Sequence, residues 1–402
     1  MTLASPSTAT AFGPVGDRPL EYTLSPQEAA EFAERARWAV ESFGTPLEEE
    51  FYEQVWRHDD LLPTGLRAFF QEFRHREPAT ACLVHGLPVD DAEIGPTPDH
   101  WLDAIAGRSA RGQETMLALC GLVLGDPFGW ATLQEGSIVQ NVLPIRGEED
   151  RQSGYGSEAL LEFHTEDGFH PHRCDYLMLL GLRNPDAVPT IVASVRDVQL
   201  DEQDRAILSQ ERYHILPDTE HIRQLATSDP DHPALGRLRR MESAPAPVSV
   251  LFGDVLAPYL RIDRPFMRCV GDDPEAAAAL DRLMAELTRV QQEIVVGPGS
   301  LLVVDNYRAA HGRRAFRARF DGADRWLKKL TVSRNLRRGI AATCAASSSD
   351  PVSGVHARPG TVPGPGRHPE RLNPCAPLSS PAPPAASDEP PRNGSPHPAT
   401  TW

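Results

Sequence analysis

The densest group of reactive side chains in the sequence is the run His164-Thr165-Glu166-Asp167, which overlaps the end of the apolar segment ALLEFHTE. If that segment is a β-strand, His164 and Glu166 project from the same face, because successive side chains alternate. An imidazole nitrogen and a carboxylate oxygen could then grip one cation, and one distant histidine would complete the facial triad of non-haem Fe(II) sites. The triplet by itself does not decide this, since a buried structural histidine also fits it.

A third ligand and a carboxylate clamp are both available in a later segment. LLVVDNYRAAHGRRAF places His311 just beyond a β-type run, and Arg325 follows fourteen residues later at the start of RWLKKLTV. A guanidinium matches the two oxygens of a carboxylate with two parallel hydrogen bonds, which an ammonium cannot do. Arg325 could therefore clamp a dicarboxylate, although on spacing alone it could equally be one more arginine of a basic stretch.

Short β-type runs separated by Gly, Pro or Asp would position these residues. Helices are predicted over residues 25–44, 47–57, 64–76 and 114–124, and as insertions over 201–212 and 274–292. About eight short strands with helices in front and between predict a mainly β fold, a sandwich or jelly roll supported by helices. Among the predicted strands are SIVQNVLPI, ALLEFHTE, DYLMLLGLR, TIVASV, VSVLFG, YLRID, EIVVGPGSLLVVDN and RWLKKLTVS.

The prolines divide the chain unevenly. Fourteen of the 38 prolines lie between Pro351 and Pro398, and the only aromatic residue after Ala341 is Trp402. Such a segment cannot bury enough apolar surface to offset its chain entropy. We therefore predict a disordered N-terminal segment over residues 1–20, one folded body over residues 21–339, and a proline-rich disordered tail over residues 340–402.

The formal net charge of -16 belongs almost wholly to the predicted body, because acids and bases balance in the tail. A surface this acidic argues against nucleic acid as a partner and suits a cationic small molecule, although solubility alone would also explain it. No apolar stretch reaches the roughly 18 residues of a membrane span, and the first twenty residues lack the pattern of a secretory signal. The six cysteines show no C-x-x-C spacing, which favours reduced thiols and a cytoplasmic location.

Three long segments resemble the clavaminate synthase-like Fe(II)/2-oxoglutarate oxygenases, and within them the arginine β-hydroxylases and asparagine hydroxylases of peptide-antibiotic pathways. The resemblance covers about residues 20–338 and implies a double-stranded β-helix, a jelly-roll core with N-terminal and inserted helices. It also implies His164, Glu166 and His311 as the iron ligands, with Arg325 as the 2-oxoglutarate clamp. The segments are GWATLQEGSIVQNVLPIRG, FHTEDGFHPHRCDYLMLLGLRNPDAVPT and VDNYRAAHGRRAFRARFDGADRWLKKLTVSR.

The resemblance further implies that Fe(II), 2-oxoglutarate and O2 are used to hydroxylate an unactivated side-chain carbon, C3 or C4, of a free polar or basic L-amino acid in secondary metabolism. Arginine is the first candidate, and citrulline, lysine and asparagine are alternatives. A substrate tethered to a carrier protein stays open, but the acidic body makes it the less favoured hypothesis. A non-catalytic amino-acid-binding jelly roll is the least favoured, because the three ligands and the clamp arginine are all present.

Two aspartates stand where the arginine hydroxylases hold the substrate guanidinium, Asp218 in ILPDTEH and Asp263 in YLRIDRPF. A desolvated guanidinium must be paired, so two carboxylates around it make physical sense. A turn aspartate and a loop aspartate without function are the structural alternatives. Pro265 replaces a second aspartate of those enzymes, which puts arginine itself in doubt.

The amino acid end also departs from the pattern of those enzymes. Leu133 replaces a glutamine that meets the amino acid head group, which leaves its neighbour Gln134 as a candidate. Lys329 replaces an arginine that binds the substrate carboxylate; the charge is kept but the bidentate fork is lost. The ligand Glu166 lies near the substrate amino group in this family, and Ser157 in GYGSEALLEFH is a further candidate for that end.

Four other polar residues lie close to these motifs. His170 and His172 in GFHPHRCD resemble a metal pair, but they follow the H-x-E strand into a turn, so a structural role is favoured. Asn141 and Arg146 are candidates for orienting 2-oxoglutarate or for closing the site.

Overall fold

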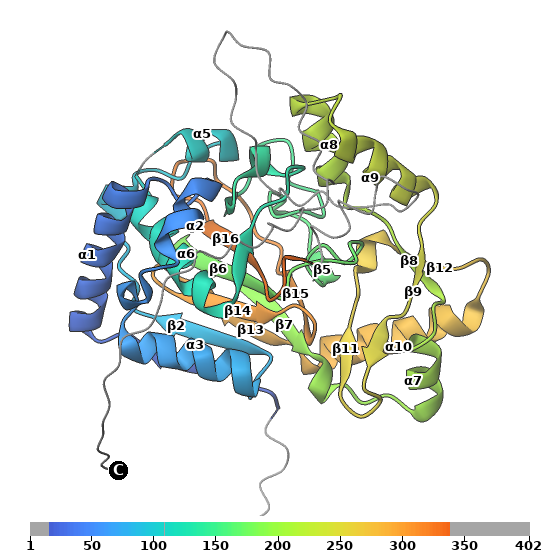
Figure 1. Ribbon diagram of the computed structural model, residues 1–402. Coiled ribbons are helices and arrows are strands. Elements are labelled where there is room, and N and C mark those ends of the chain that lie inside the picture. Colours follow the sequence, from blue (N-terminus) through green and yellow to red (C-terminus); the bar gives the residue numbers. More distant parts are fainter. Residues whose placement is uncertain (1–15, 108, 338–402) are drawn as a thin grey trace, which may run out of the picture. The chain divides into compact units, whose positions relative to one another are not determined.

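Two β-sheets face each other in the computed structural model, which describes residues 16–107 and 109–337 (Figure 1). The larger sheet contains β1 (Leu20–Thr23), β2 (Ala81–His85), β3 (Asp126–Phe128), β4 (Val139–Val142), β6 (Tyr176–Arg183), β14 (Leu301–Asp305) and β16 (Trp326–Ser333). The smaller sheet contains β5 (Leu161–His164), β7 (Pro189–Ser194), β13 (Gln292–Val295) and β15 (Ala309–Arg313). Their orders are β1-β2-β14-β6-β16-β3, with β4 also paired to β16, and β13-β7-β15-β5.

Strand β6 shows how the layers are built. Met178 and Leu180 point to the outer face of the larger sheet, whereas Leu177 and Leu179 point to the space between the two sheets. Both faces are buried, which explains why DYLMLLGLR is continuously apolar instead of alternating. The same alternation on β16 sends Leu330 outward and Leu327 inward.

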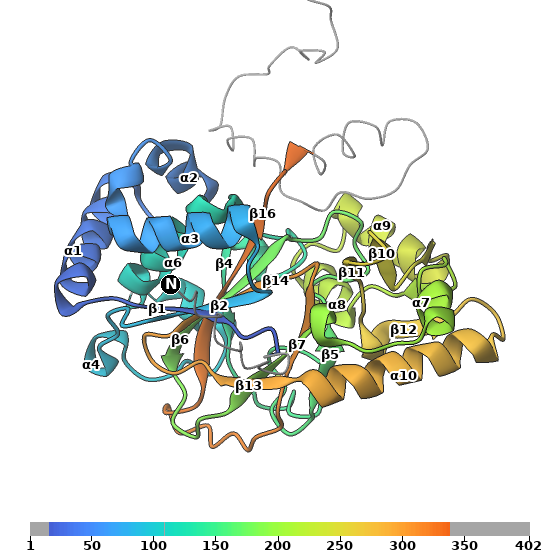
Figure 2. The same ribbon diagram turned by 90° about the horizontal axis from the view of Figure 1, so that it is seen from below.

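Helices cover the outer face of each sheet. On the larger sheet lie α1 (Pro26–Phe43), α3 (Thr64–Arg76) and α6 (Arg111–Leu124), and on the smaller sheet lie α7 (Glu202–Leu208) and α10 (Pro274–Val290), as Figures 1 and 2 both show. Helix α1 begins with a capping box in which Ser25 and Glu28 each bond to the other's backbone N–H. Shorter helices α2 (Glu49–Val55), α4 (Asp91–Ile94) and α5 (Trp101–Ala106) join these layers.

A segment between the sheet strands carries two helices that the sequence analysis did not predict. Helices α8 (Thr219–Ser228) and α9 (Pro233–Ser243) follow β8 (Tyr213–Ile215) and precede β9 (Pro247–Val248), which pairs with β8. Their sequences are short and strongly polar, with only a few apolar residues at helical spacing, such as Ile222 and Leu225 in α8 and Leu235 and Leu238 in α9. The available signals were the N-caps: the side chains of Asp218 and His232 accept backbone N–H groups, and Pro233 opens α9. Strands β10 (Leu251–Gly253), β11 (Pro258–Leu260) and β12 (Met267–Cys269) complete this region.

Ordered structure begins before the predicted body boundary at residue 21. Asp17 donates its N–H to the Asp197 carboxylate (2.8 Å) and accepts from the Ser194 hydroxyl (2.7 Å), and Leu20 opens β1 in a parallel pairing with β2. The predicted proline-rich tail, residues 340–402, lies outside the described residues. Within the described ranges, no helix combines the length and the apolar character needed to cross a membrane.

Candidate active site

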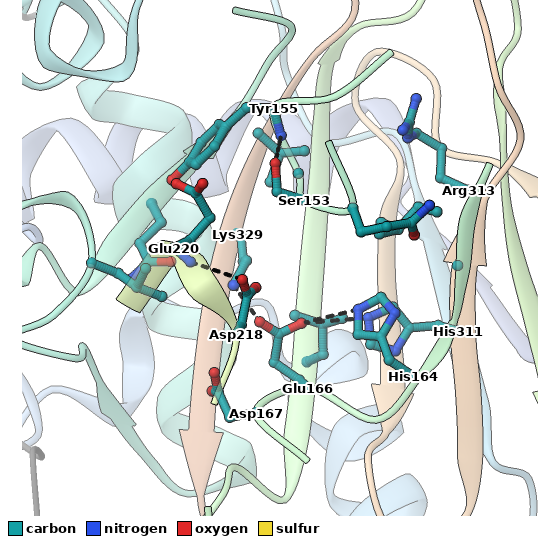
Figure 3. Close-up of a pocket in the computed structure, with 18 of the residues that line it drawn as sticks. Ser153, Tyr155, His164, Glu166, Asp167, Asp218, Glu220, His311, Arg313 and Lys329 are labelled. Atoms are coloured by element: carbon teal, nitrogen blue, oxygen red, sulfur yellow. Dashed lines mark hydrogen bonds and ion pairs between the residues drawn. The ribbon is translucent and has the colours of Figure 1, made fainter. Parts of the chain in front are cut away.

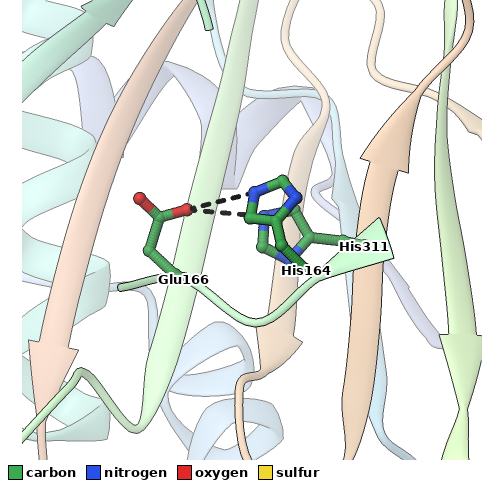
Figure 4. A group of neighbouring side chains, drawn as sticks. All are labelled: His164, Glu166 and His311. Atoms are coloured by element: carbon green, nitrogen blue, oxygen red, sulfur yellow. Dashed lines mark ion pairs between the residues drawn. The ribbon is translucent and has the colours of Figure 1, made fainter. Parts of the chain in front are cut away.

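The pairing of β5 with β15 brings the three predicted metal ligands together. His164, the last residue of β5, lies directly opposite His311 on β15, and Glu166 follows two residues beyond the strand. The Nε2 atoms of His311 and His164 lie 3.4 and 4.0 Å from the same oxygen, Oε2 of Glu166 (Figure 4). One donor atom from each residue lies within 4.8 Å of the other two, so one ion could contact all three.

The side chains of His164 and Glu166 have the protonation states that binding of a cation requires. Nδ1 of His164 lies 2.9 Å from the Glu162 carbonyl, which places the proton on Nδ1 and leaves the Nε2 lone pair free. Burial, with a further effect from His311, lowers the pKa of His164 to about 4, so the ring is neutral near pH 7. Burial raises the pKa of Glu166, but Lys329 and the two histidines outweigh it and hold that pKa well below its usual range.

The backbone of Glu166 is clamped by Asn306, a residue that the sequence analysis did not single out. The Asn306 side chain accepts from Glu166 N–H (2.6 Å) and donates to the carbonyls of Glu166 and Cys174 (both 3.0 Å). Thr165 is tied to Ile262 by a backbone bond of 2.7 Å and a hydroxyl bond of 3.0 Å. The ligand loop is therefore fixed although it lies past the end of its strand.

Two buried guanidinium groups form a basic end of the site. Arg325 shares the inward face of β16, and its Nη2 lies 3.4 Å from the Thr190 hydroxyl. Arg313, two residues after His311 on β15, donates to the carbonyls of Ser157 and Ala159 (both 3.2 Å). Neither arginine has an acidic partner among the described residues. Burial lowers the pKa of Arg325 to about 9, with a contribution from Arg313, and lowers the pKa of Arg313 to about 10. The charge and burial of this end suit an anion.

Two carboxylates form an acidic end. Asp218 caps α8 by accepting from Glu220 N–H (2.9 Å), and Asp263 is buried in a β-bridge opposite His164. No cation pairs with either carboxylate within residues 16–107 and 109–337. Burial raises the pKa of Asp218 to about 6, and burial together with Asp218 and Glu166 raises the pKa of Asp263 well above its usual value. The charge of this end suits a cation.

One cavity contains the metal ligands and both charged ends. It measures about 1060 Å³ including its open mouth, and Figure 3 shows Arg313 on the side of His311 and Asp218 beyond Glu166. The side chains of Val142, Leu179 and Leu327 also line it. The arrangement places an anion receptor, a metal site and a cation receptor along one space.

Lys329 and Gln140 lie between these ends. They are directly opposite each other on β16 and β4, and both line the cavity. The Lys329 ammonium is paired with Oε1 of Glu166, the oxygen that does not face the histidines. The Gln140 amide makes no hydrogen bond to another described residue. Sequence reasoning missed Gln140; the signal available was its two-residue spacing from Val142 on a strand that alternates inward and outward side chains.

The other predicted contacts to the amino acid head group are placed differently. Gln134 lines the cavity, but its amide already donates to the Asn141 carbonyl (2.8 Å) and the Tyr155 hydroxyl (2.9 Å) and accepts from Asn141 N–H (2.9 Å). Ser157 is not part of the cavity lining; its buried hydroxyl has no partner among the described residues. Ser153 and Tyr155 line the cavity from the same loop.

Asn141 and Arg146 are engaged in structural contacts. The Asn141 side chain accepts from Lys328 Nζ (2.6 Å) and from Trp326 Nε1 (3.0 Å), two residues on the outward face of β16. The Arg146 guanidinium carbon lies 4.4 Å from the centre of the Phe320 ring. Asn141 still contributes to the cavity lining, whereas Arg146 does not.

His170 and His172 do not join a metal-binding group among the described residues. Nδ1 of His170 accepts from His172 N–H (3.1 Å), and its ring meets the edge of Trp130 at a centroid distance of 4.5 Å. Burial lowers the pKa of His170 well below its usual value. These contacts are what the favoured structural role requires.

Comparisons with known proteins bear directly on this site. Residues 113–331 match the family described as taurine catabolism dioxygenase TauD, TfdA family. The chain belongs to the TauD/TfdA family. It is 43% identical over 308 residues to the enduracididine beta-hydroxylase of Streptomyces hygroscopicus, covering 74% of this chain and 90% of that protein. It is 40% identical over 284 residues to the L-ornithine/L-arginine 3-hydroxylase of Catenulispora acidiphila, covering 69% and 83%.

A solved structure is similar over most of this chain. The non-heme iron oxygenase OrfP in complex with Fe, succinate and (3S)-hydroxy-L-Arg has a TM-score of 0.74 and 37% identity, covering 80% of this chain and 96% of OrfP. OrfP has also been solved with Fe and alpha-ketoglutaric acid. The predicted family and jelly-roll fold are thus confirmed, and this TauD/TfdA member is a non-haem Fe(II)/2-oxoglutarate-dependent dioxygenase.

Proposed function

We propose that this dioxygenase hydroxylates C3 or C4 of a free basic L-amino acid, with arginine as the first candidate substrate. The observation that carries the proposal is a pair of carboxylates, the partly buried Asp218 and the buried Asp263, which have no cationic partner among the described residues and line the same cavity as the metal ligands. Carboxylates held away from water are stabilised by a bound cation. A guanidinium or ammonium at the end of the substrate side chain would supply it.

His164, Glu166 and His311 would hold Fe(II), a metal that this two-histidine, one-carboxylate donor set suits. When bound, Fe(II) supplies the chemistry that couples decarboxylation of 2-oxoglutarate to succinate with oxidation of a C–H bond by O2. The protein's own contribution is to bind and orient the reactants and to keep the site dry. Lys329 holds the outer oxygen of Glu166, which leaves the inner oxygen facing the histidines.

The far carboxylate of 2-oxoglutarate would pair with Arg325. The nearby Arg313 adds a second positive charge, and the Thr190 hydroxyl adds a donor. Leu179 and Leu327 would flank the methylene groups and exclude water from this part of the cavity. The anion would thereby offset the cost of burying two guanidinium groups that have no acidic partner among the described residues.

The α-amino and α-carboxylate groups of the substrate would lie near Glu166 and Lys329. The Gln140 amide, directly opposite Lys329, is a further hydrogen-bonding group for this end. An ammonium offers one point charge where an arginine offers a bidentate fork, so a second group that orients the carboxylate is useful here. Gln134 and Ser157 fit this role less well, because the Gln134 amide is already paired and Ser157 is not part of the cavity lining.

The relatives support a basic substrate. The names of the two curated relatives specify a β-hydroxylase of enduracididine and a 3-hydroxylase of ornithine and arginine, and OrfP was solved with hydroxylated arginine. Attack at C3 is therefore favoured over C4. Pro265 lines the cavity beside Asp263 in place of a further carboxylate, so ornithine, lysine and citrulline stay alternatives.

Succinate release with mass detection of the added oxygen tests the proposal. Purified protein with Fe(II) and 2-oxoglutarate is offered arginine, ornithine, lysine, citrulline or asparagine, and His311→Ala serves as the inactive control. We expect the highest turnover with a cationic amino acid. Release of no succinate above the control with any of them would reject a free amino acid substrate, and turnover with a carrier-tethered amino acid alone would establish the alternative.

We further propose a cytoplasmic location and a place in antibiotic or other secondary-metabolite biosynthesis. The four cysteines of the described residues, Cys82, Cys120, Cys174 and Cys269, are unpaired, which suits a reducing compartment. We propose the predicted body, residues 21–339, as the oxygenase domain, extended at its start by the ordered residues from Gly16.

A further inference from the structure

The helix that carries Asp218 is attached to the metal site mainly through polar side chains. Among the described residues, the apolar residues of α8, such as Ile222 and Leu225, cluster with α9 and with Phe169, and none joins the core between the two sheets. Its buried polar residues include Glu220, His221 and Gln224; Glu220 and His221 line the cavity, and the Gln224 side chain accepts from Gln134 N–H (2.8 Å). The position of α8 over the site therefore depends mainly on polar contacts, which are the ion pairs of Glu220 with Arg151 and of Arg223 with Glu148 together with the hydrogen bonds of its buried side chains.

His221 makes two of these bonds with both of its ring nitrogens. Nδ1 lies 2.5 Å from the Thr132 hydroxyl, and Nε2 lies 3.0 Å from Oδ1 of Asp167. The second oxygen of Asp167 accepts from Trp130 Nε1 (2.5 Å). Because a carboxylate has no proton to donate, Nε2 carries a ring proton, and in the neutral ring Nδ1 accepts from the Thr132 hydroxyl. Every polar atom in this chain of bonds then has a partner.

The other end of this chain is the loop of the metal ligand. Asp167 directly follows Glu166 and has a left-handed backbone, with a φ of 52°. Left-handed backbone is uncommon outside glycine and persists where surrounding contacts hold it. All four side chains are buried, with Asp167 4% and His221 3% exposed, so water does not compete for these bonds. His221 is three residues after Asp218, within the first turn of α8.

We propose that Trp130, Thr132, Asp167 and His221 form a latch that holds the first turn of α8 at the metal site. His221 is then a positioning residue for the Asp218 carboxylate, and the inference rests on the proposed function only for that role of Asp218. Breaking the latch displaces the cation receptor while the metal ligands and the basic end stay in place. The substrate carbon is then poorly aimed, and a larger share of the 2-oxoglutarate is converted with O2 to succinate and CO2 without hydroxylation, while an added reductant such as ascorbate supplies the two electrons that, with two protons, reduce the second oxygen atom to water.

Hydrogen exchange measures the latch without any turnover. We expect faster exchange over residues 219–228 in His221→Phe, which keeps a flat ring but removes both bonds, and in Thr132→Val, which removes one hydroxyl with little change of shape. His221→Gln keeps a donor near the position of Nε2 and should restore most of the protection. Thr227→Ala on the exposed side of α8 is the matched control. Unchanged exchange in both His221→Phe and Thr132→Val would overturn the latch.

The coupling of 2-oxoglutarate consumption to amino acid hydroxylation tests the positioning role of His221. The ratio of hydroxylated amino acid to succinate should fall, and the KM for the amino acid should rise about tenfold in His221→Phe, as expected for one or two lost buried hydrogen bonds. The 2-oxoglutarate affinity and the Co(II) affinity should change less than about twofold. A tenfold loss of Co(II) affinity, or an unchanged product ratio, would overturn it.

Failure of the latch and failure of the proposed function are distinguishable. If the wild-type protein hydroxylates a basic amino acid and the variants keep its coupling ratio, the positioning role is wrong and the function stands. If the wild-type protein turns over no basic amino acid, the proposed function is wrong, and hydrogen exchange over α8 still decides whether the latch exists. Should His221→Phe fail to fold, Thr132→Val and His221→Gln supply both measurements.

Discussion

The two ends of the cavity follow the same electrostatic principle with opposite sign. At one end Arg325 and Arg313 are buried without an acidic partner, and at the other the buried Asp263 and the partly buried Asp218 have no cationic partner, within the part of the chain that the structure describes. Burial shifts each pKa toward the uncharged form. Each end is therefore completed by a ligand of opposite charge, and the metal ligands lie between them.

The ends differ in how the fold holds them. Arg313 lies on β15 and Arg325 directly precedes β16, strands that are paired on both sides within the sheets. Asp218 is the cap of a helix in an inserted segment, and Asp263 lies in a loop before a single 3-10 turn. A shared co-substrate suits a rigid receptor, whereas a receptor on inserted segments can change without disturbing the sheets. If the proposed roles of the two ends hold, co-substrate binding and substrate choice are built on separable parts.

The largest expected effect is the loss of the metal site that joins the two ends. His311→Ala should abolish turnover and the visible band that forms when Fe(II) and 2-oxoglutarate are mixed without O2, because one of three protein ligands is gone. Binding of arginine, measured by calorimetry, should persist because the acidic end does not include His311. If arginine binding is lost as well, the two ends are not independent.

The next effect should fall on the basic end alone. Arg325→Gln should weaken 2-oxoglutarate binding by about 2–5 kcal/mol, the usual range for truncating one partner of a buried charged pair. Arg313→Gln should weaken it by about tenfold, since its charge acts from beside the clamp. The measurement is the 2-oxoglutarate concentration dependence of the anaerobic Fe(II) band.

Arg314→Gln is the matched control for that series, because the neighbouring side chain pairs outward with Glu293 (2.6 Å). It should leave 2-oxoglutarate binding unchanged. An Arg313→Gln variant that behaves like Arg314→Gln would limit the anion receptor to Arg325.

A smaller effect should fall on the acidic end alone. Asp263→Asn should raise the KM for arginine by about 2 kcal/mol, or roughly 30-fold, while citrulline, which is uncharged in its side chain, should be affected much less. The exposed Asp272→Asn is the control. Steady-state kinetics with both substrates gives the answer, and equal effects on arginine and citrulline would remove charge recognition from Asp263.

The smallest effect is on stability and depends on pH. Because the pKa of Asp218 is raised to about 6 in the folded protein, folding is penalised as the pH rises from about 4 through 6, and the penalty is complete near pH 7.5. Asp218→Asn keeps a good helix cap and removes the charge. It should therefore stabilise the ligand-free protein by about 1–3 kcal/mol at pH 7.5 and have little effect near pH 4.

Denaturant unfolding at the two pH values measures this difference. An equal effect of Asp218→Asn at pH 4 and pH 7.5 would mean that the carboxylate is not desolvated in the folded protein. Addition of arginine should reduce the stability difference between the variant and the wild type at pH 7.5, because the bound cation offsets the buried charge.

The metal site could be predicted from the sequence because each of the motifs that indicate it is short and local. His164 and Glu166 are two residues apart at the end of a β-type run, and His311 follows another such run. The resemblance to the oxygenase family supplied the assignment of these three residues, and the structure brings them within 4.8 Å of one another. Arg325 was also predicted as the 2-oxoglutarate clamp, and it lines the same cavity as the three ligands, whereas Arg313, which lines that cavity too, was not singled out.

The parts that sequence reasoning missed depend on contacts between distant segments. Asn306 acts on Glu166 across 140 residues, and Gln140 faces the cavity only because β4 pairs with β16. The His221 latch joins segments 54 and 89 residues apart in the chain. The local sequence of α8 does not indicate these partners, because a polar helix face has the same residue types whether it contacts water or other polar groups.

The sequence by itself therefore determined the donor set, the alternation that turns it inward, and the acidic and basic residues from which a site could be built. Only the tertiary structure decided which of these charges lack a partner among the described residues. The physical reason is that residue type sets the charge of a side chain, whereas burial and pairing depend on which strands lie side by side. The chain has 56 acidic and 40 basic residues, and many of them form ion pairs with one another in the folded protein. The fold leaves four charged side chains at the two ends of the cavity available to ligands, namely Arg325, Arg313, Asp218 and Asp263.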